Sequence, residues 1–129
     1  MQEDVFLFFD GKPAEFSLYA ALEEALLEQC PETVVRVQRT QISFYGKHGF
    51  GSAALPYRRK KDWPKNCLIV SFGLDHPVQS PRIFSAVEPY PQRWTHHVLI
   101  SSPEEIDDEL LSWLKEAFLF SETKGRRRK

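Results

Sequence analysis

Cysteine is scarce in this chain of 129 residues, with Cys30 and Cys67 far apart and outside any C-x-x-C spacing. This excludes a disulfide framework and the usual zinc-binding or redox cysteine motifs. Hydrophobic runs are short, and none approaches the roughly 20 residues that a membrane-spanning helix needs. The start of the chain, Met-Gln-Glu-Asp, lacks the basic segment of a secretory signal. We therefore expect a cytoplasmic protein with two free thiols and no membrane association.

Enzyme signature motifs are missing as well. The glycine-rich segment 46–51 lacks the Gly-Lys-Ser/Thr that ends a phosphate-binding loop, and no G-x-G-x-x-G, H-E-x-x-H or G-x-S-x-G pattern occurs. His96 and His97 are adjacent on an expected strand, so their side chains point to opposite faces and do not suit one shared metal. The sequence therefore predicts no catalytic residue, no metal site and no cofactor.

An amphipathic helix is expected near the start of the chain. Pro13 suits the first helical position, and an apolar stripe then runs through Leu18, Leu22 and Leu26 until Pro31 ends the helix. Four glutamates lie off this stripe and are expected to face water: Glu15, Glu23, Glu24 and Glu28.

A second helix is expected near the end of the chain. Ser102 and Glu105 form a capping box, with Pro103 at the first helical position. Apolar residues then recur at helical spacing and are expected to lie on a sheet; they are Ile106, Leu110, Trp113, Leu114, Ala117 and Phe118.

Between the helices the hydrophobic period changes to two, which predicts β-strands. The apolar face of the first strand switches near Arg39-Thr40, and we interpret this switch as a β-bulge or a break in the strand. The apolar segment 67–74 is expected to be a central strand, whereas 82–88, flanked by prolines, suits an edge. With 94–100 as the last strand, we predict an α+β fold: an antiparallel sheet of about five strands packed by an N-terminal and a C-terminal helix.

Charge is unevenly distributed although the net charge is only −1. Residues 36–65 hold eight basic residues and one acidic residue, whereas the flanking segments are acidic. Six of these basic residues are predicted to bind an anion or nucleic acid: Arg36, Arg39, Arg58, Arg59, Lys60 and Lys61. The last four lie between Tyr57 and Trp63, as in basic nucleic-acid-binding loops with aromatic flanks; the alternative is an ordinary solvated connection. Residues 1–123 are expected to form a single domain and 124–129 a basic, disordered tail.

A second candidate site lies where a proline-bounded loop enters the last strand. Five side chains there are predicted to receive a planar or anionic ligand: Glu88, Tyr90, Arg93, Trp94 and His96. Arginine supplies a forked donor, the aromatic rings supply stacking faces, and histidine or glutamate can move a proton near neutral pH. The alternative is that Trp94 belongs to the core and Arg93 pairs with an acidic residue.

Four segments, 39–45, 58–61, 88–97 and 102–107, resemble those of a small bacterial family catalogued as domain of unknown function 5655. The resemblance spans residues 18–118. It implies a compact α+β domain in the cytoplasm. Because the family has no established activity, the resemblance implies no catalytic residue.

Three functions remain open from the sequence. The first is a non-catalytic binding module whose basic strands and loop receive an anionic partner: nucleic acid, an acidic protein or a metabolite. The second is a protein-interaction or homodimer-forming domain that exposes an edge strand or the phenylalanine-rich N-terminus. The third is a small enzyme acting on a nucleotide-like or acyl substrate, with Glu88 and either His96 or His97 as acid–base groups and Arg93 holding an anion.

Overall fold

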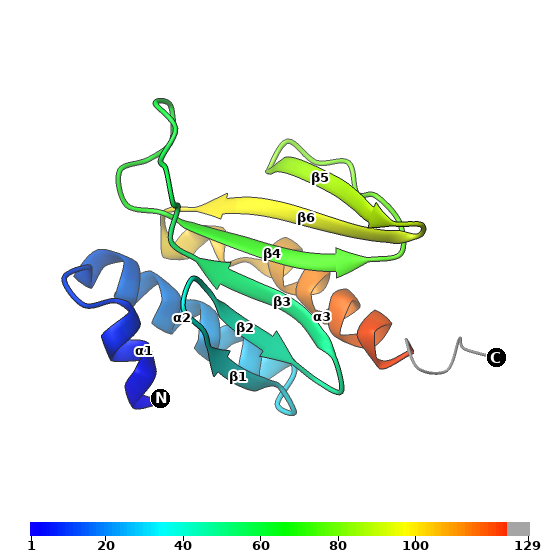
Figure 1. Ribbon diagram of the computed structural model, residues 1–129, viewed down its shortest axis with the longest axis horizontal. Helices are drawn as coiled ribbons and strands as arrows, with labels where there is room; N and C mark the ends of the chain where they lie inside the picture. Colours follow the sequence, from blue (N-terminus) through cyan, green and yellow to red (C-terminus); the bar gives the residue numbers. More distant parts are fainter. Residues whose placement is uncertain (124–129) are drawn as a thin grey trace.

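A computed structural model describes residues 1–123, which form three α-helices, one short 3-10 helix and one six-stranded sheet (Figure 1). The helices are α1 (Glu3–Phe8), α2 (Pro13–Gln29), η1 (Pro103–Glu105) and α3 (Asp108–Glu122). The strands are β1 (Val34–Val37), β2 (Ile42–Tyr45), β3 (Gly49–Ala54), β4 (Leu68–Leu74), β5 (Ile83–Tyr90) and β6 (Arg93–Ile100). All pairs are antiparallel, and the strand order is β1-β2-β3-β4-β6-β5. The predicted disordered tail, 124–129, lies outside the described residues.

The two faces of the sheet differ. Helices α2 and α3 pack on one face, whereas no helix of residues 1–123 lies on the other (Figure 1). We call the uncovered side the open face. The predicted α+β class, with an antiparallel sheet and helices at both ends, is confirmed, and β4 and β5 occupy the predicted interior and edge positions.

The core lies between the sheet and α2 and α3. Alternate residues of β4 are almost fully buried; they are Leu68, Val70, Phe72 and Leu74. The buried apolar residues of α3 are Leu110, Trp113, Leu114 and Ala117, as their helical spacing predicts. Each fully buried side chain of this size contributes roughly 1.5–3 kcal/mol. This apolar surface therefore holds the helices on one face and leaves the other free.

The chain between Val34 and Tyr45 forms two strands rather than one strand with a bulge. A tight turn separates β1 from β2, and the Gln38 N–H donates to the Gln41 carbonyl at 2.8 Å. Because the chain reverses at this turn, odd-numbered residues of β1 (Val35, Val37) and even-numbered residues of β2 (Ile42, Phe44) face the same core. The predicted switch near Arg39-Thr40 is therefore a break between two strands rather than a β-bulge, and the sheet has six strands instead of about five.

Two of the four glutamates predicted to face water are buried. Glu15 is 8% exposed and Glu23 is 9% exposed. The Tyr19 hydroxyl donates to Glu23 at 2.7 Å, and the Asn66 amide donates to Glu15 at 3.0 Å. Burial raises the pKa of Tyr19 far above its usual range, and the hydrogen bond to the Glu23 carboxylate raises it further. The prediction was wrong because the spacing of apolar residues gives no information about hydrogen-bond donors elsewhere in the fold. Such donors allow a carboxylate to be buried.

The predicted capping box begins η1 rather than α3. The Glu105 carboxylate accepts the N–H groups of Ser101 and Ser102 at 2.6 and 3.3 Å. Asp107 then caps α3 by accepting the Leu110 N–H at 3.0 Å, and it also pairs with Arg82 at 2.9 Å. The Leu110 N–H and Arg82 lower the pKa of Asp107. Arg82 thereby ties the segment before β5 to the start of α3.

Candidate functional site

A line of polar side chains crosses the open face from one edge of the sheet to the other. In the register of the sheet, one polar residue of each strand stands opposite a polar residue of its neighbour. Residues that are directly opposite share a face. We call this line the polar row; in spatial order it contains Arg36, Ser43, Ser52, Ser71, His97 and Ser85.

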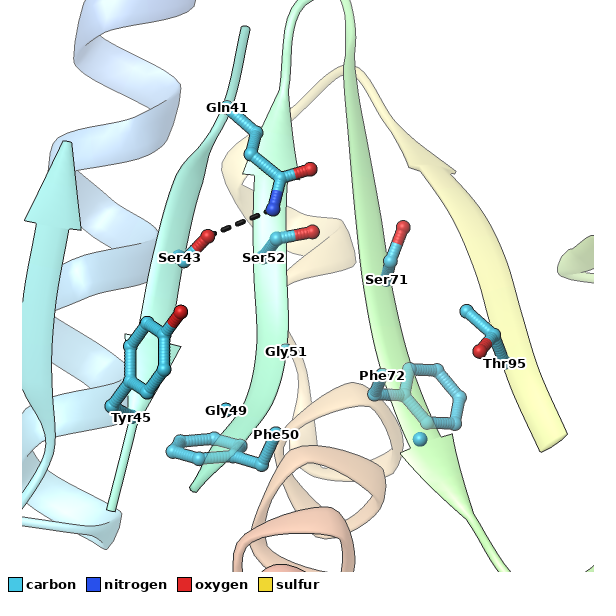
Figure 2. A pocket seen from close by; sticks show the side chains of 11 residues that line it. Gln41, Ser43, Tyr45, Gly49, Phe50, Gly51, Ser52, Ser71, Phe72 and Thr95 are labelled. Atoms are coloured by element: carbon cyan, nitrogen blue, oxygen red, sulfur yellow. Dashed lines mark hydrogen bonds between the residues drawn. The ribbon is translucent and has the colours of Figure 1, made fainter. Parts of the chain in front are cut away.

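The middle of the polar row lies in a hollow of about 270 Å³ (Figure 2). Its lining contains small, polar and aromatic residues but no charged side chain: Gln41, Ser43, Tyr45, Gly49, Phe50, Gly51, Ser52, Ser71, Phe72, Gly73 and Thr95. Gly73 contributes open space, since a Cβ there would meet only the Trp94 carbonyl oxygen, at 3.8 Å. The hollow is therefore a neutral, polar depression in an otherwise uncovered sheet.

Some of the hydroxyl groups in the hollow are held by neighbouring side chains. The Gln41 amide donates to Ser43 at 2.8 Å (Figure 2), and Ser43 donates to Gln38. By contrast, the hydroxyls of Ser52 and Thr95 form no side-chain hydrogen bond with another residue of the described part of the chain. Two donors and acceptors thus remain available to a bound molecule.

His97 stands beside the hollow and connects it to the last strands. The Ser71 hydroxyl lies 2.7 Å from the His97 Nδ1, which joins β4 to β6. Burial lowers the pKa of His97, which favours the neutral ring with Nδ1 as acceptor for the hydroxyl. The ring of Phe84 lies 6.1 Å from the His97 ring, so β5 is part of the same cluster.

The predicted basic loop, Arg58–Lys61, is attached to this cluster by Trp63. The Trp63 ring lies 5.1 Å from the ring of Phe84. Arg59 donates to the Trp63 carbonyl at 3.3 Å, and the Lys60 ammonium lies 5.8 Å from the Trp63 ring centre. The loop is therefore held at the β5 side of the open face.

The other two predicted anion-binding residues lie apart from each other. Arg36 belongs to the polar row, and its guanidinium lies 4.6 Å over the ring of Tyr45, which lines the hollow. Arg39 is in the β1–β2 turn and lines a separate cavity of about 720 Å³ with Tyr57 and Leu7. The structure thus associates Arg36 and the basic loop with the open face, and Arg39 with the neighbourhood of α1.

The structure brings together three of the five residues in the second candidate site. Tyr90, Arg93 and Trp94 line a cavity of about 240 Å³. Gly73 and Thr95 line both this cavity and the hollow, so the two depressions adjoin. The Arg93 guanidinium lies 5.6 Å from the ring centre of Phe120, a residue of α3. The Arg93 cation therefore lies against α3, at a cavity that adjoins the hollow.

Glu88 and His96 are absent from the lining of that cavity. Glu88 accepts the Gln92 N–H at 2.9 Å within the β5–β6 turn. His96 is fully buried, its ring is stacked 4.9 Å from that of Phe72, and its Nε2 accepts the Val78 N–H at 3.0 Å. Burial lowers the pKa of His96. The two groups suggested for acid–base chemistry thus have separate structural partners.

Comparison with known families gives one match, which covers most of the chain. Residues 7–121 match the model of a family described as Domain of unknown function (DUF5655). The chain belongs to this family. The resemblance inferred from the sequence is therefore confirmed, and it extends beyond the segments that indicated it. No curated protein and no solved structure matches the chain.

Charge in this DUF5655 domain is divided between the two sides of the sheet. Helices α2 and α3 together contain eight acidic residues and one basic residue, Lys115. The six strands contain one acidic residue, Glu88. Negative charge is therefore concentrated in the helical layer, away from the open face.

Within residues 1–123 of this DUF5655 domain, no group of three His, Cys, Asp or Glu residues is arranged to hold a metal ion. No helix in the same range is long and apolar enough to cross a membrane.

Sequence reasoning missed most of the hollow. Ser52, Ser71 and Thr95 are common residues on three different strands, and each is unremarkable in its own segment. One signal was present: β4 places Ser71 and Gly73 at positions that alternate with bulky residues such as Phe72. Small polar residues on one face of strands whose other face is apolar indicate a sheet surface without a covering layer.

Proposed function

We propose that this DUF5655 domain is a cytoplasmic bacterial module that binds single-stranded nucleic acid on the open face of its sheet. The observation that carries the proposal is the neutral hollow on an uncovered face, with cations around it. Arg36 lies on one side, Arg93 at the adjoining cavity, and the basic loop beyond His97. Cations neutralise phosphates, while rings and hydroxyls contact bases and sugars.

A single strand fits this face better than a duplex does. Tyr45 and Phe84 lie on the open face, and Phe84 is 41% exposed. Aromatic rings stack on bases that have left a duplex, and such stacking supports binding of single strands. In a duplex the flat faces of the bases already stack on one another, so these rings would have no partner.

The acidic helical layer supports the same orientation. A phosphate chain approaching α2 and α3 meets eight carboxylates, of which two are buried. Charges interact over about 10 Å at 0.1 M salt. Repulsion by the helices and attraction by Arg36 and the basic loop therefore favour contact through the open face.

A cytoplasmic location belongs to this proposal. Cys30 and Cys67 are buried free thiols, and burial raises the pKa of both. Unpaired cysteines are usual in reducing compartments, where nucleic acid is also found.

The two alternatives have less support. The enzyme interpretation needs Glu88 and a histidine near one ligand, but the cavity beside Arg93 is lined by neither. The interaction-domain interpretation rests on exposed side chains around the 720 Å³ cavity near α1, where Leu7 is 69% and Tyr57 is 96% exposed. At the sheet edge, Gln2 donates to the Val35 carbonyl at 2.7 Å, which occupies one pairing position of β1.

Binding of short, labelled single-stranded oligonucleotides, followed by fluorescence anisotropy, tests the proposal. We expect affinity to fall steeply between about 50 and about 200 mM salt, because bound phosphates release counterions. The double variant Arg58→Ala/Arg59→Ala should bind more weakly and with a shallower salt dependence. The control Lys12→Ala/Lys115→Ala removes the same charge from exposed residues of the helical layer and should match the wild type. Absence of binding at the lower salt, or equal losses in the two variants, would overturn the proposal.

A further inference from the structure

We infer that the hollow receives one unstacked nucleobase and thereby gives the bound strand a base preference. This inference rests on the proposed function and adds a specificity site to it. The contacts to phosphate described above carry no sequence information, because every nucleotide has the same phosphate. A base preference requires a place where the edge of a base meets fixed donors and acceptors.

The chemistry of the hollow selects a neutral polar group. Its lining contains no arginine, lysine or carboxylate, so a phosphate or a metal ion placed there would lack a charged partner. A wholly apolar group would cover the hydroxyls of Ser52 and Thr95 without bonding them, which is unfavourable. A nucleobase has a flat apolar face and neutral donors and acceptors on its edge, and it satisfies both conditions.

The hydroxyls are placed to contact such an edge from two sides. Strand β4 lies between β3, which carries Ser52, and β6, which carries Thr95. Figure 2 shows the side chains of Ser52, Ser71 and Thr95 around the hollow on these three strands. Ser71 is held by His97 and Ser43 by two glutamines, so part of the surface is ordered before a ligand arrives. Ordered polar groups discriminate between ligands better than mobile ones do.

The size and surroundings of the hollow fit one base within a longer strand. Its volume of about 270 Å³ is slightly below the roughly 300–1,000 Å³ of pockets for drug-sized ligands. Tyr45 adds a ring to the wall, and the Arg36 guanidinium lies 4.6 Å over that ring. Arg93 lines the adjoining cavity. A nucleotide in a strand is flanked by two phosphates; Arg36 lies on one side of the hollow, and Arg93 lies past its other side, against α3.

Filling the hollow tests this inference. Gly73→Leu places a side chain in the open space at Gly73, where even a Cβ meets nothing closer than 3.8 Å. Ser112→Leu adds the same side chain to an exposed position of α3 and is the matched control. Each protein is titrated with single-stranded A, C and U homopolymers of equal length. We expect the wild type and the control to discriminate on the order of tenfold in Kd between the best and worst base. Gly73→Leu should bind all three alike and keep its salt dependence.

A second variant removes the donors without filling the space. Ser52→Ala/Thr95→Val deletes both uncommitted hydroxyls and nearly preserves shape. It should also reduce the base preference while retaining the salt dependence, which keeps the inference testable if Gly73→Leu does not fold. Salt-dependent binding without base preference in the wild type would overturn the inference and leave the proposed function standing. A base preference that persists in both variants would also overturn the inference and leave the proposed function standing. If no homopolymer binds at low salt, the proposed function fails and the base site fails with it.

Discussion

The Ser71 hydroxyl lies 2.7 Å from the His97 Nδ1 on the neighbouring strand, and this contact links the centre of the sheet to the basic loop. Beyond His97 lies the ring of Phe84, and beyond Phe84 lies Trp63. A continuous set of contacts therefore runs from the polar row to the cations of Arg58–Lys61. These contacts fix the position of those cations relative to the hollow.

The first prediction concerns the attachment of the basic loop. Trp63→Ala removes the ring that packs on Phe84 and should release the loop, because apolar contact with the sheet is lost. Limited digestion with a protease that cuts after lysine and arginine should then cleave at Arg58–Lys61 severalfold faster. Tyr57→Ala changes a 96% exposed ring in the same connection and should leave the rate unchanged. Equal cleavage of wild type and Trp63→Ala would show that the contact does not hold the loop.

The second prediction concerns stability at low pH. Burial lowers the pKa of His96 and His97, so the native state binds fewer protons there than the unfolded chain does. The stability they contribute is complete above the ordinary histidine pKa of about 6.5 and falls as the pH drops below it. The free energy of unfolding from urea titrations should therefore decrease between about pH 7 and about pH 5. Asp107, whose pKa is also lowered, acts in the same direction only below about pH 4.

His76 provides an internal contrast to this second prediction. Its hydrogen bond to Glu116, 2.8 Å long, raises its pKa. The stability from His76 is therefore present below about pH 6.5 and is lost as the pH rises through its native pKa. The contribution is small, since both side chains are half exposed. His76→Gln should make the acid-side decrease steeper. A stability that stays flat or rises on acidification to about pH 5 would contradict the assignment of neutral, buried His96 and His97.

The third prediction compares two strand glycines. A Cβ at Gly51 would lie 2.9 Å from the backbone oxygen of Ser71, whereas one at Gly73 would have no neighbour closer than 3.8 Å. Because a backbone atom cannot move aside without disturbing the β3–β4 pairing, Gly51→Ala should destabilise the fold by about 1–3 kcal/mol. Gly73→Ala should change the free energy of unfolding by less than about 0.5 kcal/mol. Urea denaturation of both variants checks the difference, and equal effects would argue against the close approach at Gly51.

The fourth prediction concerns the buried carboxylate of α2. Tyr19→Phe removes the hydroxyl that donates to Glu23 at 2.7 Å and leaves the 9% exposed carboxylate without this donor. The expected loss is about 1–3 kcal/mol in the free energy of unfolding. In the double variant Tyr19→Phe/Glu23→Leu, both polar groups are absent, and part of the loss should be recovered. A single variant as stable as the wild type would show that Glu23 is satisfied by water instead.

Most of the secondary structure could be predicted from the sequence because periodicity is a local property. The apolar segment 67–74 predicted β4, and Pro13 and Pro31 bracketed α2. The β1–β2 turn was missed because the residues from Gln38 to Gln41 include none of the glycine, asparagine or aspartate typical of tight hairpins.

The candidate site was harder to predict because it depends on strand order and register. β4 pairs with β6 rather than with β5, which brings Ser71 opposite His97, 26 residues away in the chain. No local pattern reports such a pairing. The sequence showed the basic residues as one charged segment. Only the fold shows that Arg39 lies near α1 whereas Arg36 lies on the open face. Glu88 and His96 were sensible candidates by residue type, and only the structure assigns them their internal partners.

Mapping a bound oligonucleotide onto the protein by NMR tests the open-face proposal most directly. The backbone amide signals of the full chain would be followed while a short single strand is added at low salt. We expect the largest shifts on the polar row and the basic loop, including Ser52, Ser71 and His97, and no change in the exposed residues of α2 and α3. Shifts confined to the helical layer or to the cavity lined by Leu7 and Tyr57, or no shifts at all, would contradict it.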